Sequence, residues 1–399
     1  MLVERLFMHT IENLRTPFFL IKEQIVSENV TAFRNALSIY GNNSTLAYSI
    51  KTNTLPALIQ WMKRQSVMAE VVSDEEYELA LLCGYKPSEI IFNGPIKSED
   101  YFIKAIKNGS IVNLDSQKEL KCLAAYIPAH RGTIGIRINL NPDLFQNEDI
   151  GYQEDGFRFG FSEENDNLKN AVEEYERIYH NRNIGLHLHV NSVTRAVAVY
   201  ETIAKYARSI VEKYRISPPF IDIGGGFFGG VPGKPSPSEY LSAIKKEFEK
   251  SDQLSQVRLI VEPGSALIGS AVELYTSVLD VKDTALARIV TTDGSRIHID
   301  PLWIKNRYSY RIESDGRPFQ KQLICGYTCM DHDRLMVIES EPELSCGDKI
   351  IYEKVGNYTT TLGGSFICTA PAVYMEDSSG IHLIRKKMSV TEYYQMETV

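Results

Sequence analysis

The feature of the sequence that most constrains its fold is the alternation of short apolar runs with helix-length amphipathic stretches through the first two thirds of the chain. The apolar runs do not alternate strictly with polar residues, which is typical of strands buried on both faces. We predict strands at 46–50, 69–72, 90–93, 111–114, 135–139, 184–190, 220–225 and 258–264. Amphipathic helices are predicted between them, for example at 74–84, 116–127, 193–214 and 237–250.

Eight strands with intervening helices over roughly 240 residues predict an α/β protein built on a (β/α)₈ barrel of the TIM type. A doubly wound sheet is the alternative. Denser β runs follow at 273–283, 287–295, 335–344 and 349–358 and predict a C-terminal antiparallel β domain. The 399 residues suffice for two domains. We place the barrel at 28–268 and the β domain at 1–27 and 269–399.

The charge balance narrows the classes of function. Lys and Arg total 43 and Asp and Glu total 51, so the net charge is −8. This mild acidity argues against nucleic-acid partners, and no run reaches the roughly 18 to 20 apolar residues that span a membrane. The first 17 residues lack a secretory-signal pattern. We therefore expect a cytoplasmic protein that acts on a small molecule.

The cysteines point to neither disulfides nor a metal. Six cysteines are few for a chain of this length, which predicts no disulfide framework. Cys325 and Cys329 are separated by three residues, with no second pair and no suitably spaced histidines, so they do not form a zinc motif. We predict no metal site.

Polar residues gather where the predicted barrel strands end. The loops that follow the carboxyl ends of barrel strands converge on one mouth, where active sites form. These positions hold Lys51, Ser73, His189, Gly224, Gly225, Gly226 and Glu262. The strand ends therefore predict an active site.

Lys51 follows the apolar run 46–50, where an ammonium group loses solvation. We expect its pKa to fall, because burial disfavours the charged form, and its amine then becomes a nucleophile toward a carbonyl, as in Schiff-base lysines. The alternative is a lysine that reaches solvent or pairs with a carboxylate in the barrel.

Three further positions each allow two interpretations. Glu262 ends an apolar strand, where a carboxylate suits either a pyridinium N–H or a structural salt bridge. The glycines 224–226 suit either a phosphate cradle of backbone N–H groups or a flexible turn. His189, between apolar neighbours, is either a hydrogen-bonded core residue or a flat ring against a planar cofactor.

The order of these residues, followed by Cys329, Asp333 and Tyr358 in the β region, resembles the fold-type III pyridoxal-phosphate decarboxylases, which include ornithine, arginine and diaminopimelate decarboxylases. The resemblance runs from about residue 16 to residue 366. It implies pyridoxal 5′-phosphate as the cofactor and α-decarboxylation of an amino acid as the activity. It also implies a homodimer in which the β domain of one protomer completes the site of the other.

The resemblance implies a role for each matching residue. Lys51, in Y-x-x-K-x-N, would hold the cofactor aldehyde as a Schiff base, and Cys329 from the other protomer would protonate the α-carbon. His189 would stack on the pyridine ring, Glu262 would pair with its nitrogen, and Tyr358 would contact the phosphate. The residues expected at the cofactor are Lys51, Glu70, Ser73, His189, Ser192, Gly224, Gly225, Gly226, Glu262, Gly264 and Tyr358.

Four departures from the family pattern bear on the cofactor and substrate. Glu70 replaces an aspartate, and Ser265 replaces the arginine that follows Glu-Pro-Gly. Met330 stands where diaminopimelate decarboxylases have glutamate and ornithine decarboxylases have aspartate. Asp300 stands where diaminopimelate enzymes have an arginine for the distal carboxylate, which an aspartate would repel unless it lies in a surface turn. We therefore predict that Asp300, Met330 and Asp333 contact the substrate, and that the substrate is not diaminopimelate.

Two alternative functions stay open. A racemase of the same architecture would need a second base opposite the lysine and usually pairs the ring nitrogen with arginine, whereas this chain offers Glu262. A catalytically inactive, decarboxylase-like regulatory protein would not need Lys51, His189 and Cys329, which are all present. The residues favour a decarboxylase.

Overall fold

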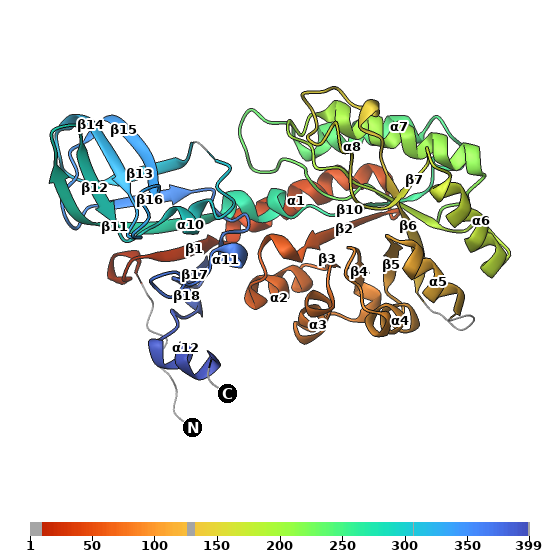
Figure 1. The fold of residues 1–399 in the computed structure, drawn as a ribbon, viewed down its shortest axis with the longest axis horizontal. Coiled ribbons are helices and arrows are strands. Elements are labelled where there is room, and N and C mark those ends of the chain that lie inside the picture. The colour runs from red at the N-terminus through yellow and green to blue at the C-terminus, as the bar shows by residue number, and fades with distance from the viewer. Residues whose placement is uncertain (1–9, 126–131, 306, 398–399) are drawn as a thin grey trace. The chain divides into compact units, whose positions relative to one another are not determined.

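A computed structural model describes residues 10–125, 132–305 and 307–397 of the chain. The chain divides into two compact units, one formed by residues 29–267 and the other by the chain before and after that segment. Figure 1 shows both units and labels most of their helices and strands.

The unit of residues 29–267 is a closed barrel of parallel strands. Its strands are β2 (Ser44–Ser49), β3 (Met68–Val71), β4 (Ile90–Phe92), β5 (Ile111–Leu114), β6 (Thr133–Asn139), β8 (Gly185–Leu188), β9 (Phe220–Asp222) and β10 (Arg258–Val261). Their order is β5-β4-β3-β2-β10-β9-β8-β6, and pairing of β5 with β6 closes the ring. A short strand, β7 (Phe161–Ser162), lies beside β6. The predicted (β/α)₈ barrel is confirmed.

The barrel strands are apolar because both of their faces are covered. Every residue of β5 and of β8 is buried. Side chains from five strands meet in one apolar cluster, which comprises Ala47, Ile91, Ile111, Phe220 and Ile260. Burial on both faces accounts for the continuous apolar runs from which the strands were predicted.

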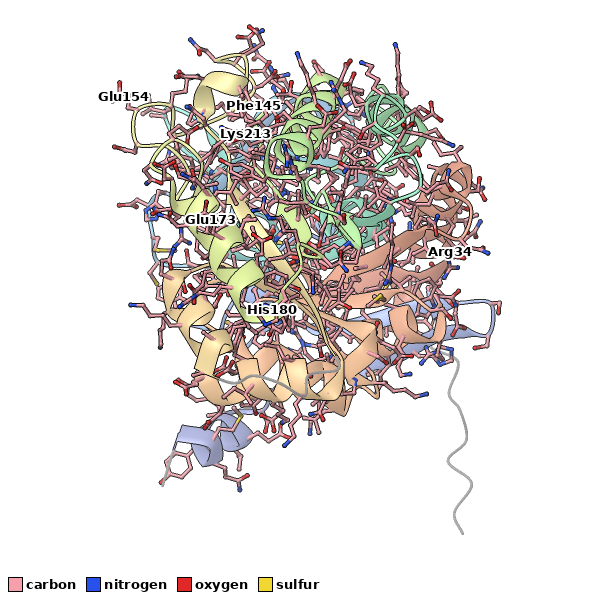
Figure 2. The ribbon with its side chains drawn as sticks, turned by 90° about the vertical axis from the view of Figure 1, so that its right-hand side faces the viewer. Arg34, Phe145, Glu154, Glu173, His180 and Lys213 are labelled. Atoms are coloured by element: carbon pink, nitrogen blue, oxygen red, sulfur yellow. The ribbon has the colours of Figure 1, made fainter. Side chains whose placement is uncertain are left out.

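One helix, α1 (Glu23–Leu37), precedes the first barrel strand, and the other helices of this part of the chain follow barrel strands. These others are α2 (Pro56–Arg64), α3 (Asp74–Leu82), α4 (Glu99–Asn108), α5 (Gln117–Ala125), α6 (Asn167–Tyr179), α7 (Val197–Tyr214), α8 (Pro237–Phe248) and α9 (Ser265–Ile268). Helix α6 buries Leu168, Val172 and Tyr175 at the spacing of one helix face. Figure 2 shows its labelled residue Glu173, and Lys213 on α7, both of which are exposed. Apolar periodicity thus decides which helix face packs on the barrel.

The other unit is built on a sheet of nine strands. These are β1 (Phe18–Lys22), β11 (Val272–Asp283), β12 (Arg288–Thr292), β13 (Ser309–Glu313), β14 (Pro318–Cys325), β15 (Arg334–Pro342), β16 (Lys349–Glu353), β17 (Ala372–Asp377) and β18 (Gly380–Arg385). Its helices are α10 (Arg296–Ile299), α11 (Thr359–Leu362) and α12 (Val390–Glu397). Short 3₁₀ turns in the chain lie at Ile11–Asn13, Ser38–Tyr40, Ile50–Thr52, Pro87–Glu89, Pro142–Leu144 and Gly269–Ala271.

This sheet is mixed rather than wholly antiparallel, which corrects the sequence prediction. β1 runs parallel to β17, and β12 runs parallel to β14. The first pair joins strands from opposite ends of the chain, so no hairpin dictates their direction. In the second pair, the intervening β13 pairs with β16 instead of with its neighbours in sequence. The other pairs of the sheet are antiparallel.

None of the helices in the described ranges combines the length and the apolar character that crossing a lipid bilayer requires.

Candidate active site

Lys51 lies in the 3₁₀ turn Ile50–Thr52, directly after β2. Its amine is 3.0 Å from Oε2 of Glu70 and 3.3 Å from Oε1, and 42% of its side chain is exposed. Gly264, after β10, packs against this turn so closely that a Cβ there would lie 2.0 Å from Oγ1 of Thr52. The lysine is therefore held at the barrel mouth by an ion pair and is accessible, rather than enclosed in apolar surroundings as the sequence indicated.

Glu70, on β3, is the charged partner of Lys51. It also accepts hydrogen bonds from Ser49 Oγ at 2.5 Å and from Asn93 Nδ2 at 3.1 Å. Burial acts to raise the pKa of Glu70, but the Lys51 charge and the hydrogen bonds outweigh it and leave the pKa below its ordinary value. Glu70 is thus ionised and oriented toward the amine.

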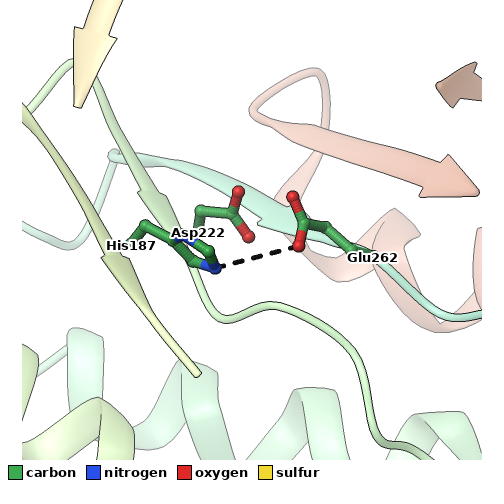
Figure 3. A group of neighbouring side chains, drawn as sticks. All are labelled: His187, Asp222 and Glu262. Atoms are coloured by element: carbon green, nitrogen blue, oxygen red, sulfur yellow. Dashed lines mark ion pairs between the residues drawn. The ribbon is translucent and has the colours of Figure 1, made fainter. Parts of the chain in front are cut away.

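Glu262, Asp222 and His187 form a cluster of buried polar side chains, drawn in Figure 3. They come from the ends of β10 and β9 and from β8, and one polar atom of each lies within 4.8 Å of those of the other two. Nε2 of His187 is 3.8 Å from Oε2 of Glu262. Asn93 Nδ2 donates to the other oxygen of Glu262 at 2.8 Å. Asp222 accepts a hydrogen bond from the backbone N–H of Gly224 at 2.9 Å.

Burial sets the protonation of this cluster. It raises the pKa of Glu262 well above its ordinary value, with the Asp222 charge adding to the effect, and it raises the pKa of Asp222 to about 7. Burial also lowers the pKa of His187 well below 6.5, and the Arg137 charge lowers it further. Near neutral pH the histidine is therefore uncharged, and the two carboxyl groups hold a proton between them.

The glycines 224–226 and His189 pack together after β9 and β8. Gly224 has φ +70°, and a Cβ on it would lie 2.7 Å from three atoms of the His189 side chain. No described residue accepts a hydrogen bond from the N–H of Gly225 or Gly226. Burial and the charges of Arg137 and Lys51 lower the pKa of His189 to about 3, so its ring is neutral. The segment thus offers a flat neutral ring beside free backbone donors.

A cavity of about 440 Å³ opens beside His189. Its lining includes the guanidinium groups of Arg137 and Arg158, which lie 4.6 Å and 4.1 Å from the ring centre of Phe159. Tyr152 and Phe157 contribute further aromatic surface. Aromatic walls with two fixed positive charges suit an organic molecule that carries a negative group.

Residues 23–269 match the family model described as "Pyridoxal-dependent decarboxylase, pyridoxal binding domain". This chain belongs to the pyridoxal-dependent decarboxylases. The predicted family, its pyridoxal-phosphate cofactor and its activity as an amino-acid decarboxylase are confirmed.

Named relatives cover nearly the whole decarboxylase chain. It is 26% identical to a diaminopimelate decarboxylase from Archaeoglobus fulgidus, over 88% of this chain and 85% of the relative. It is also 26% identical to the Helicobacter pylori diaminopimelate decarboxylase, over 96% of each protein. The crystal structure of a diaminopimelate decarboxylase from M. jannaschi, 21% identical, matches with a TM-score of 0.85, covering 97% of this chain and 93% of that one. This structural match supports the fold of a parallel barrel with a second, sheet-based unit.

These relatives overturn the prediction that excluded diaminopimelate. That prediction relied on repulsion by Asp300, but the structure neutralises this carboxylate. It is 2% exposed, lies 3.1 Å from Nη2 of Arg296, and accepts from the backbone N–H groups of Ile304 and Lys305 at 3.2 Å and 2.9 Å. Arg296 in turn lies over the ring of Trp303. A carboxylate satisfied in this way presents no free negative charge to a substrate.

The decarboxylase residues of the barrel fit the cofactor of the family. The accessible amine of Lys51 suits an aldehyde, the neutral ring of His189 suits a flat pyridine, and the free N–H groups of Gly225 and Gly226 suit a phosphate. Glu262 offers a buried carboxyl for the ring nitrogen. Two other expected residues are engaged within the protein, because Ser73 caps α3 and the hydroxyl of Ser192 donates to Asp149 O at 2.9 Å. Their cofactor contacts stay predictions.

The predicted site residues of the β unit lie in two places. Cys329 is exposed and Met330 is partly buried in the loop between β14 and β15. Asp333, in the same loop, is buried and accepts hydrogen bonds from Ser295 Oγ, Arg296 N and Thr328 Oγ1 at 2.7 to 2.9 Å. Tyr358, at the start of α11, has φ +62°. Asp333 thus shapes the loop that carries Cys329, and the predicted contacts of these residues with ligands stay predictions.

Sequence reasoning missed four polar residues inside the barrel. Asn113 Nδ2 donates to Asn93 Oδ1 at 2.8 Å, and Asn93 bridges Glu70 and Glu262. Arg137, whose Nε lies 3.8 Å from Asp115, lines the cavity. Asp222 belongs to the buried carboxyl cluster. The available signal was that each is a polar residue inside an otherwise apolar predicted strand, where it must be paired to be tolerated.

Proposed function

We propose that this decarboxylase removes the α-carboxylate of an amino acid of the diaminopimelate type, which has a second carboxylate at the far end. The observation that carries the proposal is the cavity beside His189, because two guanidinium groups in an aromatic lining complement a distal carboxylate. The names of the relatives at 26% identity point to the same substrate. When bound, pyridoxal phosphate supplies an electron sink for the bond that releases CO₂.

The protein's own residues would divide the work as follows. Lys51 binds the cofactor through its amine, and Glu70 keeps that amine oriented. His189 supports the flat ring, and the backbone N–H groups of Gly225 and Gly226 bind the phosphate, while Gly224 makes the turn that presents them. Arg158 and Arg137 orient the substrate through its distal group. Cys329 holds at Sγ the proton that the α-carbon receives after CO₂ leaves.

We also propose a homodimer with shared sites, in which residues 28–268 form the cofactor-binding barrel and the β unit of one protomer supplies Cys329 to the other. The resemblance to the fold-type III decarboxylases supports this arrangement. Cys329 is exposed in the loop between β14 and β15, which is consistent with a role at an interface.

The substrate class is tested by measuring CO₂ release and products from diaminopimelate, ornithine, arginine and lysine. We expect lysine as the product from diaminopimelate. Arg158→Met should raise the KM for diaminopimelate about tenfold, since a hydrogen bond to a charged group contributes at least about 1.4 kcal/mol. The rate with any substrate that lacks a distal carboxylate should not change.

Arg177→Met is the matched control, because Arg177 lies on α6, pairs with Glu174 and does not line the cavity. Arg177→Met should leave unchanged both the KM for diaminopimelate and the rate with substrates that lack a distal carboxylate. Faster CO₂ release from ornithine or arginine than from diaminopimelate would contradict the proposal.

A further inference from the structure

The cluster of His187, Asp222 and Glu262 contains polar atoms without partners. Both ring nitrogens of His187 and Oδ2 of Asp222 have no hydrogen-bond partner among the described residues. The three residues are 2%, 0% and 5% exposed, so no bulk water compensates for the missing bonds. Buried polar atoms left in this way are costly, which suggests that an unseen group satisfies them.

For Asp222, the missing partner is best explained as a proton shared with Glu262. Two buried carboxylates cannot both ionise side by side without a neutralising charge. The nearby cations do not neutralise this pair, since Lys51 pairs with Glu70, and among the described residues Arg137 forms an ion pair with Asp115 rather than with Asp222 or Glu262. A proton on Glu262 can be donated to Asp222, which gives the unpartnered Oδ2 a donor. The neutral His187 adds no charge of its own.

We propose that Asp222 is a positioning residue for the ring nitrogen of the cofactor: with Glu262 it stores one proton, which passes to that nitrogen when pyridoxal phosphate binds. The O–H bond of Glu262 breaks, an N–H bond forms on the ring, and Glu262 keeps the electron pair. Two carboxylates then attract one ring cation. With the charge of Asp222 nearby, the ring nitrogen therefore stays protonated up to a higher pH than it would with Glu262 alone.

The variant Asp222→Asn tests this directly. Asparagine has nearly the same shape and keeps an oxygen for the N–H of Gly224, but it removes the negative charge and replaces Oδ2 with an NH₂ donor. Wild type and variant are loaded with pyridoxal phosphate carrying ¹⁵N in the ring, and attachment to Lys51 is verified by borohydride reduction and mass spectrometry. The ¹⁵N chemical shift is then followed as a function of pH.

We expect the ring nitrogen of the wild type to stay protonated at neutral and mildly alkaline pH. In Asp222→Asn the ring nitrogen should lose its proton at a pH about one to two units lower than in the wild type. A shift of this size is expected when one charge is removed at this separation in a partly polar interior. Glu247→Gln, which alters a buried carboxylate on α8 that pairs with Lys250 outside the cluster, should titrate as the wild type does. Identical curves for wild type and Asp222→Asn, or a neutral ring in the wild type, would overturn the proposal.

A second measurement tests the proposal even if a variant does not bind pyridoxal phosphate. The infrared spectrum of the cofactor-free wild type minus that of Glu262→Gln should show a protonated carboxyl band at neutral pH, because Glu76, which is also partly protonated there, contributes equally to both spectra. A difference spectrum without this band would equally overturn the proposal. Neither measurement adds a substrate, so both are independent of which amino acid the enzyme decarboxylates.

Discussion

The amine of Lys51 is both oriented by an ion pair and accessible to solvent. It is held in place by a buried carboxylate, Glu70, yet 42% of its side chain reaches solvent. An aldehyde can approach it, while the ion pair and Glu70's bonds to Ser49 and Asn93 restrict its direction. Orientation of the amine therefore comes from the neighbours of its partner rather than from enclosure of the lysine.

Replacing Lys51 tests this arrangement. Lys51→Ala should abolish covalent attachment of the cofactor and nearly all turnover, because the nucleophilic amine is gone. Lys51→Arg should lose attachment as well but keep the charge that Glu70 requires, so its unfolding temperature should stay closer to that of the wild type. Borohydride reduction, mass spectrometry and thermal unfolding provide the readouts. Covalently bound cofactor in Lys51→Ala would show that another amine is used.

At the scale of elements, the loop from β3 into α3 links the site to a helix end. Ser73 caps α3, and Oε2 of Glu76 accepts from Val72 N at 2.9 Å. Burial, reinforced by the Glu70 charge, raises the pKa of Glu76 from 4.5 to about 7. The helix start thus carries a carboxyl group whose ionisation is costly in the folded state.

That cost makes stability depend on pH. Between pH 4.5 and pH 7 the folded state retains a proton on Glu76 that the unfolded chain releases, so stability falls as pH rises through this window. Glu76→Gln keeps an oxygen for Val72 N. We expect it to stabilise the cofactor-free protein above pH 7 by on the order of 1 kcal/mol, with no gain near pH 4. Urea unfolding at several pH values measures this.

The control is Glu75→Gln, which changes an exposed residue on the same turn. It should show no comparable gain at high pH. Equal loss of stability in Glu76→Gln at both ends of the pH range would instead identify Glu76 as a simple structural cap.

The elements that sequence could predict are those determined by local pattern. The barrel strands follow from continuous apolar runs, and Lys51, His189 and Glu262 follow from their places at strand ends. The parallel pairing of β1 with β17 could not be predicted, because it joins segments from opposite ends of the chain. The role of Asn93 was also hidden, since its bridge between Glu70 and Glu262 exists only once the closed barrel brings the ends of β3, β4 and β10 together.

At the scale of the whole molecule, the proposed homodimer has a quantitative test. Lys51→Ala and Cys329→Ala protomers are each expected to be nearly inactive as homodimers. If each site takes Lys51 from one protomer and Cys329 from the other, a mixed dimer has one intact site. Mixing equal amounts under exchange conditions should then restore about a quarter of wild-type activity, because half of the dimers are mixed and half of their sites are intact. No recovery, despite exchange shown by mass spectrometry, would contradict shared sites.

The placement of β1 has a consequence for synthesis of the chain on the ribosome. Phe18 pairs with Tyr275 on one side and with Ala372 on the other, so one of the first strands made sits between two of the later ones. The partners of this apolar segment are made only after the barrel has been translated, and its second edge can be paired only once residues 372–376 have been made. Premature termination before residue 372 would leave that strand with one bare edge, an obvious target for chaperones and for quality control.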